Sequence, residues 1–101
     1  MPRSLQAAPL PADPHVPSLA ALGRIVRAQR VASALRIDDA AALCGVSVDL
    51  LSRLENGRSG VSTDRLLKVL DALGLVMLVV ERAKLPKALS ALADRGEPPA
   101  R

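Results

Sequence analysis

Few side chains in this sequence could carry out catalytic or metal chemistry. Among its 101 residues there is one cysteine, Cys44, and one histidine, His15. One cysteine excludes an internal disulfide and a zinc site built from several thiolates, and one histidine excludes a histidine cluster. Ser52 and Asp49 have no base beside them that would activate a nucleophile. We therefore expect no enzymatic activity, no metal site and no cofactor.

The chemistry that remains is hydrogen bonding from one side of a short helix. At about 100° per residue, residues 48–56 place their leucines on one side and mostly polar side chains on the other. The mostly polar side holds Val48, Asp49, Ser52, Arg53 and Asn56, and the apolar side holds Leu50, Leu51 and Leu54. A helix anchored by leucines that displays short hydrogen-bonding groups fits the major groove of DNA, where base edges present donors and acceptors.

Four helices are predicted from apolar periodicity and from the residues that begin and end them. Their expected ranges are 19–33, 38–44, 48–56 and 63–73. Ser18, Ser47 and Ser62 stand where a hydroxyl would cap the first turn of a helix. The second and third helices need a small residue where they cross and a turn residue that accepts positive φ. Ala41 and Gly45 meet these two needs.

The composition indicates one helical domain with tails. Half of the residues are apolar and none is Phe, Tyr or Trp, so the core must be packed from aliphatic side chains, which suits helices. Residues 1–17 contain five prolines and are expected to form a disordered arm. The domain is expected over 18–82, followed by a flexible tail over 83–101 with a frayed helix at 87–93. Because no signal peptide or membrane-spanning run is visible, we expect a cytoplasmic protein.

Residues 75–80 are predicted to form a β-strand. The run is apolar and rich in β-branched residues, and it consists of Leu75, Val76, Met77, Leu78, Val79 and Val80. An isolated strand cannot satisfy its own backbone hydrogen bonds, and the sequence predicts no second strand. We therefore expect these residues to form a homodimer interface by pairing with the same strand of a second copy. Burial of the run within the monomer core is the alternative.

The residues around the predicted turn resemble a known family. The pattern spans about residues 22–73 and consists of Ala41, Gly45, Leu51, Leu54 and the run Glu55-Asn56-Gly57. It resembles the helix-turn-helix of the Cro/cI-type (XRE) DNA-binding family. The resemblance implies an all-α, lambda-repressor-like bundle of four to five helices, here with a C-terminal β-strand pairing across a homodimer. In having a predicted strand after the fourth helix, the chain resembles the HipB-type branch of the family, which consists of antitoxins and autorepressors.

The resemblance implies two groups of DNA-contacting residues. Base edges would be contacted by Val48, Asp49, Ser52 and Arg53, and phosphates by Arg36, Ser47, Asn56, Arg58 and Ser59. By its chemistry, Arg53 would donate two hydrogen bonds to guanine O6 and N7 or would bind a phosphate. Asp49 would accept a hydrogen bond from cytosine N4, and Val48 would touch a thymine methyl group.

The chain departs from the family pattern at the start of the second helix. Arg36 and Ile37 stand where the family has a Thr or Ser cap followed by a phosphate-binding Gln. Arg36 would then supply the phosphate contact by charge, and Asp38 would take over the capping. Asp38, Asp39 and Asp49 place negative charge near the expected path of the DNA backbone, which would weaken or alter binding although the net charge is +4.

Together these features predict a homodimeric, sequence-specific DNA-binding regulator. Two recognition helices would enter successive major grooves, about 34 Å apart, of a palindromic operator and would block the protein's own promoter. The resemblance to the HipB branch implies an autorepressing antitoxin whose partner is a toxin of the HipA-like kinase type. A stand-alone repressor without a toxin is the nearest alternative. A protein-interaction module that has lost DNA binding is the alternative of a different class. A DNA-bound regulator would be associated with the nucleoid.

Overall fold

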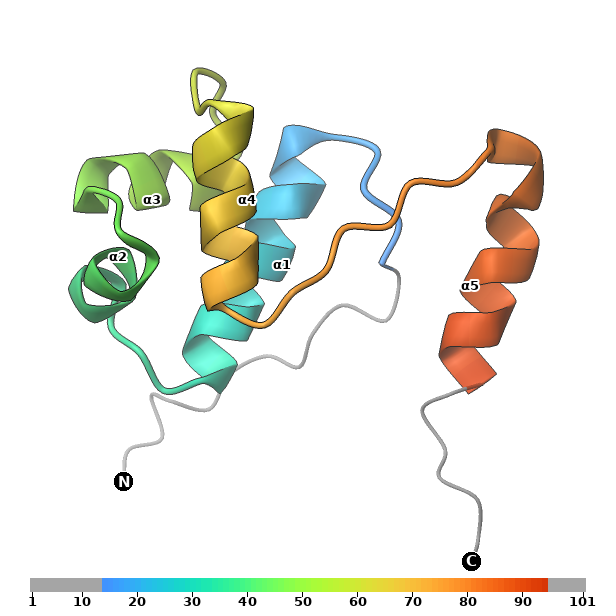
Figure 1. The fold of residues 1–101 in the computed structure, drawn as a ribbon, viewed down its shortest axis with the longest axis horizontal. Helices are drawn as coiled ribbons and strands as arrows, with labels where there is room; N and C mark the ends of the chain where they lie inside the picture. The colour runs from blue at the N-terminus through green and yellow to red at the C-terminus, as the bar shows by residue number, and fades with distance from the viewer. Residues whose placement is uncertain (1–13, 95–101) are drawn as a thin grey trace, which may run out of the picture.

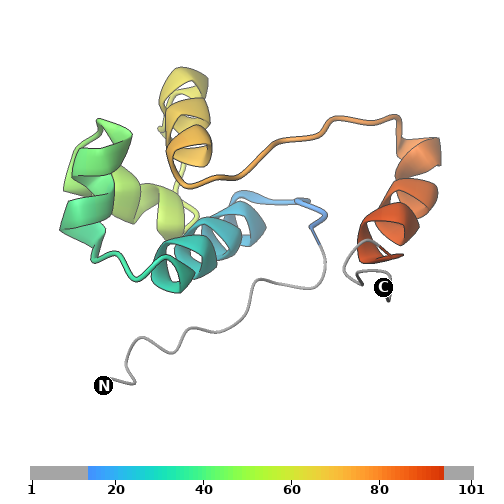
Figure 2. The ribbon, with the colours of Figure 1, turned by 60° about the horizontal axis from the view of Figure 1, so that its bottom comes forward.

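The structure describes residues 14–94, and every regular element in this range is helical. In this computed structural model the elements are α1 (Leu19–Ala32), α2 (Ile37–Cys44), α3 (Val48–Glu55), α4 (Thr63–Ala72), the short 3-10 helix η2 (Arg82–Lys84) and α5 (Leu85–Asp94). Helices α1 to α4 pack into one body, and α5 stands apart from it at the end of a long connection (Figures 1 and 2). The prediction of an all-α fold with four to five helices is confirmed for this range. Most of the predicted arm and the end of the predicted tail lie outside the described residues.

The predicted serine caps are confirmed at three helices. In each, the serine Oγ accepts a hydrogen bond from the backbone N–H three residues further on, at 3.1 Å for Ser18, 3.0 Å for Ser47 and 3.2 Å for Ser62. This bond satisfies one of the four N–H groups that the first turn of a helix leaves without a helical partner. The four helices of the body accordingly begin and end within one residue of their predicted ranges.

Helix α2 begins differently from the prediction. It starts at Ile37, and its N-cap residue Arg36 makes no side-chain capping bond. Asp38 does not cap the helix, because it lies inside the first turn, where its Oδ1 accepts a hydrogen bond from the backbone N–H of Asp39 at 3.1 Å. The two aspartates still favour the helix, since their negative charge opposes the positive potential at a helix N-terminus.

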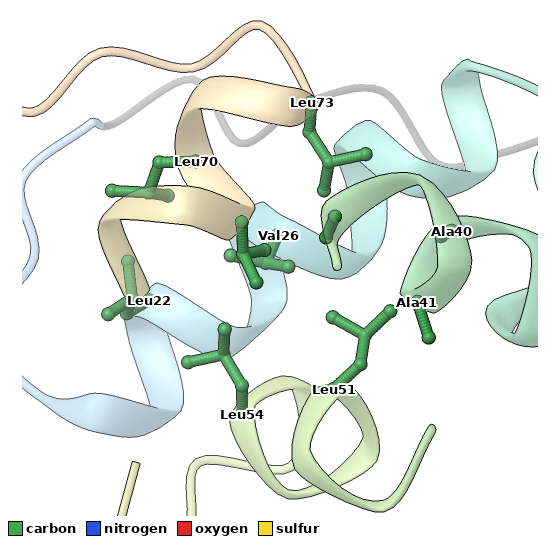
Figure 3. Packing of buried hydrophobic residues seen from close by; sticks show 10 residues of the cluster. Leu22, Val26, Ala40, Ala41, Leu51, Leu54, Leu70 and Leu73 are labelled. Atoms are coloured by element: carbon green, nitrogen blue, oxygen red, sulfur yellow. The ribbon is translucent and has the colours of Figure 1, made fainter. Parts of the chain in front are cut away.

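The four-helix body is held together by an aliphatic core. Val26 of α1, Leu51 of α3 and Val69 of α4 are fully buried. In Figure 3, Leu51 and Leu54 point from α3 toward Val26. Helix α2 contributes the small buried side chain of Ala40 to the same cluster. Small and branched aliphatic residues therefore fill the space between the helices, as the absence of aromatic residues predicted.

Helices α1 and α3 touch through their backbones. A Cβ atom at Gly23 would lie 2.5 Å from the carbonyl oxygens of both Leu54 and Glu55. After α3, Gly57 has φ +71°, and a Cβ there would lie 2.8 Å from the Cα of Ala20. Any side chain at Gly23 would push the helices apart, so the glycine sets how closely α3 approaches the body.

Residues 75–80 form no strand in the structure, so the predicted strand is not confirmed. They run as an irregular connection from α4 to η2 (Figure 1). A strand needs a neighbour to complete its hydrogen bonds, and the described part of the chain offers none. Val76 and Val79 are 89% and 84% exposed. Only Leu75 of the run packs against the core, so the alternative of a run buried within the monomer is wrong.

The chain after this connection is helical over a longer range than the sequence predicts. A frayed helix was expected only at 87–93 within a flexible tail, whereas η2 and α5 together occupy residues 82–94. Leu85 and Leu89 of α5 are half-buried, and Leu92 is exposed. Helix α5 therefore has an apolar side that the four-helix body does not cover (Figure 2).

Candidate nucleic-acid interface

A tight turn joins α2 to α3 and sets the angle at which they cross. Gly45 has φ +74°, which is the left-handed conformation predicted for it. The backbone N–H of Val46 then donates to the carbonyl of Ala41 at 3.0 Å. Ala41 is buried beside Leu51 in Figure 3. A larger side chain at Ala41 would separate α2 from α3, so the turn and the small residue together fix the direction of α3.

Helix α3 is attached to the body along one side and exposed along the other. Its buried residues are Leu50, Leu51 and Leu54, which confirms the predicted apolar side. The residues predicted to contact bases are Val48, Asp49, Ser52 and Arg53, and all four are at least partly exposed. The structure therefore brings these four side chains together on the solvent-facing side of one short helix.

The end of α3 is tied to α1 by an ion pair that the sequence analysis did not find. The guanidinium of Arg30 donates to both carboxylate oxygens of Glu55, from Nε at 2.6 Å and from Nη2 at 3.0 Å. Its Nη1 donates to the carbonyl of Leu35 at 2.9 Å. The Arg30 and Glu55 side chains are only 13% and 5% exposed. Two parallel charge-assisted hydrogen bonds fix distance and orientation together, so this pair orients α3 against α1.

From the sequence alone, Arg30 is one of three arginines at a spacing of three residues, with Arg24 and Arg27, which is typical of a solvated helix side. Arg24 and Arg27 are indeed exposed, but Arg30 is not. The spacing becomes informative only once the structure shows that Gly23 faces α3. Arg30 lies seven residues, or about two helical turns, after Gly23 and therefore on the side of α1 that faces α3.

Arg53 and Asp49 face each other across one turn of α3. Arg53 Nε lies 3.4 Å from Asp49 Oδ2, and the two side chains are 41% and 83% exposed. From the sequence, Asp49 and Arg53 were each expected to contact a base of their own, and this ion pair was not predicted. The signal for pairing is an aspartate four residues before an arginine on a helix, a spacing that places opposite charges side by side.

The residues predicted to contact phosphates lie at the start of α2 and at both ends of α3. Arg36 is exposed and lies 3.5 Å from Asp38. Ser47 accepts the capping bond through Oγ, and its own O–H can still donate. Asn56 Nδ2 donates to the carbonyl of Ser52 at 2.8 Å. The exposed residues Arg58 and Ser59 follow α3 in the loop that leads to α4. This group of residues therefore brackets α3 with donors, as a helix flanked by two phosphate backbones requires.

Cys44 lies at the end of α2 and belongs to the core. It is buried, and this burial raises the pKa of its thiol above the usual value of 9.0. Burial disfavours the thiolate, so Cys44 is a small apolar residue here and not a nucleophile.

Two other kinds of site are absent from the described range. No group of three or more His, Cys, Asp or Glu residues within 14–94 could hold a metal ion. No helix of this range has both the length and the apolar character needed to cross a membrane.

Comparison with known proteins gives a relative and a family. No curated protein matches the chain. Among solved structures, the chain is similar to the clp gene regulator ClgR from C. glutamicum, with 28% sequence identity and a TM-score of 0.52. The alignment covers 84% of this chain and 100% of that chain. A family model described as a helix-turn-helix domain matches residues 21–85, which include α2, α3, α4 and most of α1. The resemblance to helix-turn-helix proteins is thereby confirmed, and the chain belongs to this helix-turn-helix domain family.

Proposed function

We propose that this protein is a transcription regulator that binds a specific double-stranded DNA sequence through α3. The observation that carries the proposal is how α3 is held. Buried leucines and the Arg30–Glu55 pair fix it to the body, while its other side is exposed. A helix held in this way can enter a major groove without first being ordered, so its base contacts are not offset by the entropy of ordering. The similarity to ClgR, which is described as a gene regulator, supports a role in transcription.

In this proposal the side chains of α3 read bases and the surrounding donors hold the duplex in register. Base edges are read from Val48, Asp49, Ser52 and Arg53, and phosphates are bound by Arg36, Ser47, Asn56, Arg58 and Ser59. Contacts to phosphate position a protein on DNA, whereas contacts to base edges carry the sequence information. Arg58 is the clearest phosphate ligand, because it is exposed and makes no ion pair within the described range.

Two copies acting together would extend this contact to a palindromic operator. The connection over 75–80 supports a homodimer, because it exposes a row of apolar side chains and because, within the described residues, the backbone N–H groups of residues 76–80 donate to no other backbone group. Pairing with the same segment of a second copy would bury both and would relate the two α3 helices by a two-fold axis. The axis would place these helices in successive major grooves, about 34 Å apart.

The dimer is tested by placing a charge in the connection. Val79→Lys should make the protein monomeric in light scattering without changing its helix content, because this side chain already faces solvent. Ala83→Lys in η2 also alters an exposed residue and is the matched control, which should leave the dimer intact. A wild-type protein that is monomeric at micromolar concentration would contradict the homodimer.

An antitoxin role is the more specific form of this proposal. It rests on the resemblance to the HipB branch and would make the protein an autorepressing antitoxin of a type II toxin–antitoxin system with a HipA-like kinase as its partner. The test is co-purification with the product of the neighbouring reading frame and suppression of that product's toxicity in cells. A stand-alone repressor of the XRE family would bind its operator with no such partner.

A protein-interaction module is the second candidate, and one observation favours it. Asp38, Asp39 and Asp49 are all exposed on the two helices that would approach the DNA. Carboxylates at this surface repel phosphates and would lower the affinity for any duplex.

Fluorescence anisotropy with a duplex from the protein's own promoter, at two salt concentrations, separates these candidates. A DNA-binding protein should lose affinity steeply as salt rises, because each neutralised phosphate releases counterions. Arg58→Ala should weaken binding to all sequences and reduce the slope of log K against log salt by about one. Arg82→Ala removes an exposed arginine of η2, which lies outside α2, α3 and the turn between them, and should have little effect. Binding that is absent at low salt would favour the interaction module.

A further inference from the structure

The guanidinium of Arg53 is enclosed on one edge only. Its Nε atom is buried and has no hydrogen-bond partner in the described structure, although the side chain as a whole is 41% exposed. The nearest anionic group is Oδ2 of Asp49, at the ion-pair distance of 3.4 Å. Nη1 and Nη2 form no hydrogen bond in the described structure either, yet they are not among the buried atoms that lack a partner, so both reach solvent. The solvent-facing edge of the guanidinium is therefore its Nη1–Nη2 end.

The loop between α3 and α4 leaves room for the guanidinium of Arg53 because it carries a glycine where the loop passes the guanidinium. Gly60 has φ +94°, and a Cβ atom at this position would lie 3.3 Å from Nη1 of Arg53. The backbone N–H of Arg58 also donates to the carbonyl of Arg53 at 2.9 Å. The loop thus passes close to Arg53, and Asp49 lies one helical turn before it in α3.

This geometry limits how Arg53 can contact a base. An arginine can present either its Nη1–Nη2 end or its Nε–Nη2 side to the O6 and N7 atoms of guanine. Here the Nε side is closed by Asp49 and the protein, so only the Nη1–Nη2 end is available. A carboxylate that holds an arginine in this way has its charge directed at the guanidinium rather than at a base.

We infer that Asp49 is a positioning residue that holds Arg53 for end-on recognition of one guanine, and that it does not itself read a cytosine. The inference rests on the proposed function and defines the base specificity of the same site. A helix fixes both residues four positions apart, so the arginine is already oriented before the duplex arrives. The negative charge of Asp49 is then unfavourable for binding DNA in general and favourable for selecting the correct base pair.

The test is selection of binding sites from randomised duplexes, followed by affinity measurements on the selected site and on its single-base variants. Wild-type protein should prefer guanine at one position of each half-site, and Arg53→Ala should abolish that preference. Asp49→Ala should lower the same preference by about tenfold, within the range expected for one bidentate contact. It should also increase the affinity for unrelated duplex, because a carboxylate is removed from the surface.

Two further variants separate positioning from a general charge effect. Asp38→Ala removes an exposed carboxylate that lies beside Arg36 and not beside Arg53. It should increase the affinity for unrelated duplex and leave the guanine preference unchanged. Asp49→Glu keeps a carboxylate four residues before the arginine and should retain the guanine preference within about twofold, because such pairs form readily on a helix.

Two further results test whether Asp49 acts through Arg53: the guanine preference of the double variant Asp49→Ala, Arg53→Ala, and the base pair at which Asp49→Ala alone loses a preference. If Asp49 acts through Arg53, then Asp49→Ala should not reduce the guanine preference further in an Arg53→Ala background. Loss of a cytosine preference at a different base pair in Asp49→Ala would overturn the inference and make Asp49 a base reader. An unchanged guanine preference in Asp49→Ala would overturn it as well. A wild-type protein that binds no duplex, or binds every duplex equally, would instead overturn the proposed function, and this inference with it.

Discussion

Replacing Glu55 with alanine tests whether the ion pair with Arg30 holds α3 on the body. The Glu55 carboxylate accepts hydrogen bonds from Arg30 at 2.6 Å and 3.0 Å. Its removal leaves the carbonyl of Leu35 as the remaining hydrogen-bond partner of this guanidinium. Removing one partner of a buried pair lowers the free energy of unfolding by about 3–5 kcal/mol. Because Arg30 is 13% exposed and keeps its bond to Leu35, we expect the lower end, about 3 kcal/mol.

This loss is large enough to measure by urea unfolding and by thermal melting. For a domain of this size, about 3 kcal/mol corresponds to a decrease in Tm of roughly 12–24 °C. The matched control is Glu81→Ala, which breaks an exposed pair with Lys84 at 3.7 Å. We expect the control to change the free energy of unfolding by less than about 0.5 kcal/mol.

The double variant Arg30→Met with Glu55→Leu distinguishes loss of the pair from loss of packing. Both charges are removed together, so no buried charge is left uncompensated and most of the stability should return. A Glu55→Ala protein within about 1 kcal/mol of wild type would refute the role of this pair as an anchor. So would a double variant that is as unstable as the single one.

Three further predictions concern stability. Gly23→Ala should lower the free energy of unfolding by about 1–3 kcal/mol, because the added Cβ would lie 2.5 Å from carbonyl oxygens of α3. Alanine at an exposed helix position raises the Tm, so a higher Tm for this variant would contradict the close approach of α1 to α3. Ser47→Ala should lower the free energy of unfolding by about 1 kcal/mol in urea unfolding through loss of the cap, and Ser47→Asp, which keeps an acceptor, should not. Burial raises the pKa of the Cys44 thiol above 9.0, so as pH rises the thiol loses its proton in the unfolded chain before it does so in the folded protein. The stability that Cys44 contributes is therefore present below pH 9.0 and is lost as pH rises above 9.0. Cys44→Ala should lack this component, and equal pH dependence of the two proteins above pH 9.0 would show that the thiol is not protected.

The helices of the body could be predicted because local chemistry decides them. A serine before an apolar run supplies the hydroxyl that the first turn needs, and Ser18, Ser47 and Ser62 all do so. The positive φ of Gly45 could be predicted for the same reason, because the tight turn between α2 and α3 requires a residue that adopts the left-handed conformation. In each case the deciding groups lie within a few residues of one another along the chain.

The connection over 75–80 could not be predicted in the same way. Its β-branched and apolar residues favour a strand, but strand formation depends on a second strand and not on the sequence of the first. A single chain supplies no such partner within the described range, so the segment is irregular and exposed. An exposed segment without a neighbouring strand leaves its backbone groups to water, and this is the state that the structure of one copy shows.

The features of the candidate site that could be predicted are local in the sequence, and those that could not be predicted depend on contacts between distant residues. That Val48, Asp49, Ser52 and Arg53 share one side of α3 follows from helical periodicity and could be predicted. What holds that helix in place could not, because Arg30 and Glu55 are 25 residues apart and meet only where Gly23 lets α1 approach α3. The role of Asp49 lies between these cases. Its spacing to Arg53 permits both a separate base contact and an ion pair, and the burial of Arg53 Nε is what favours the ion pair.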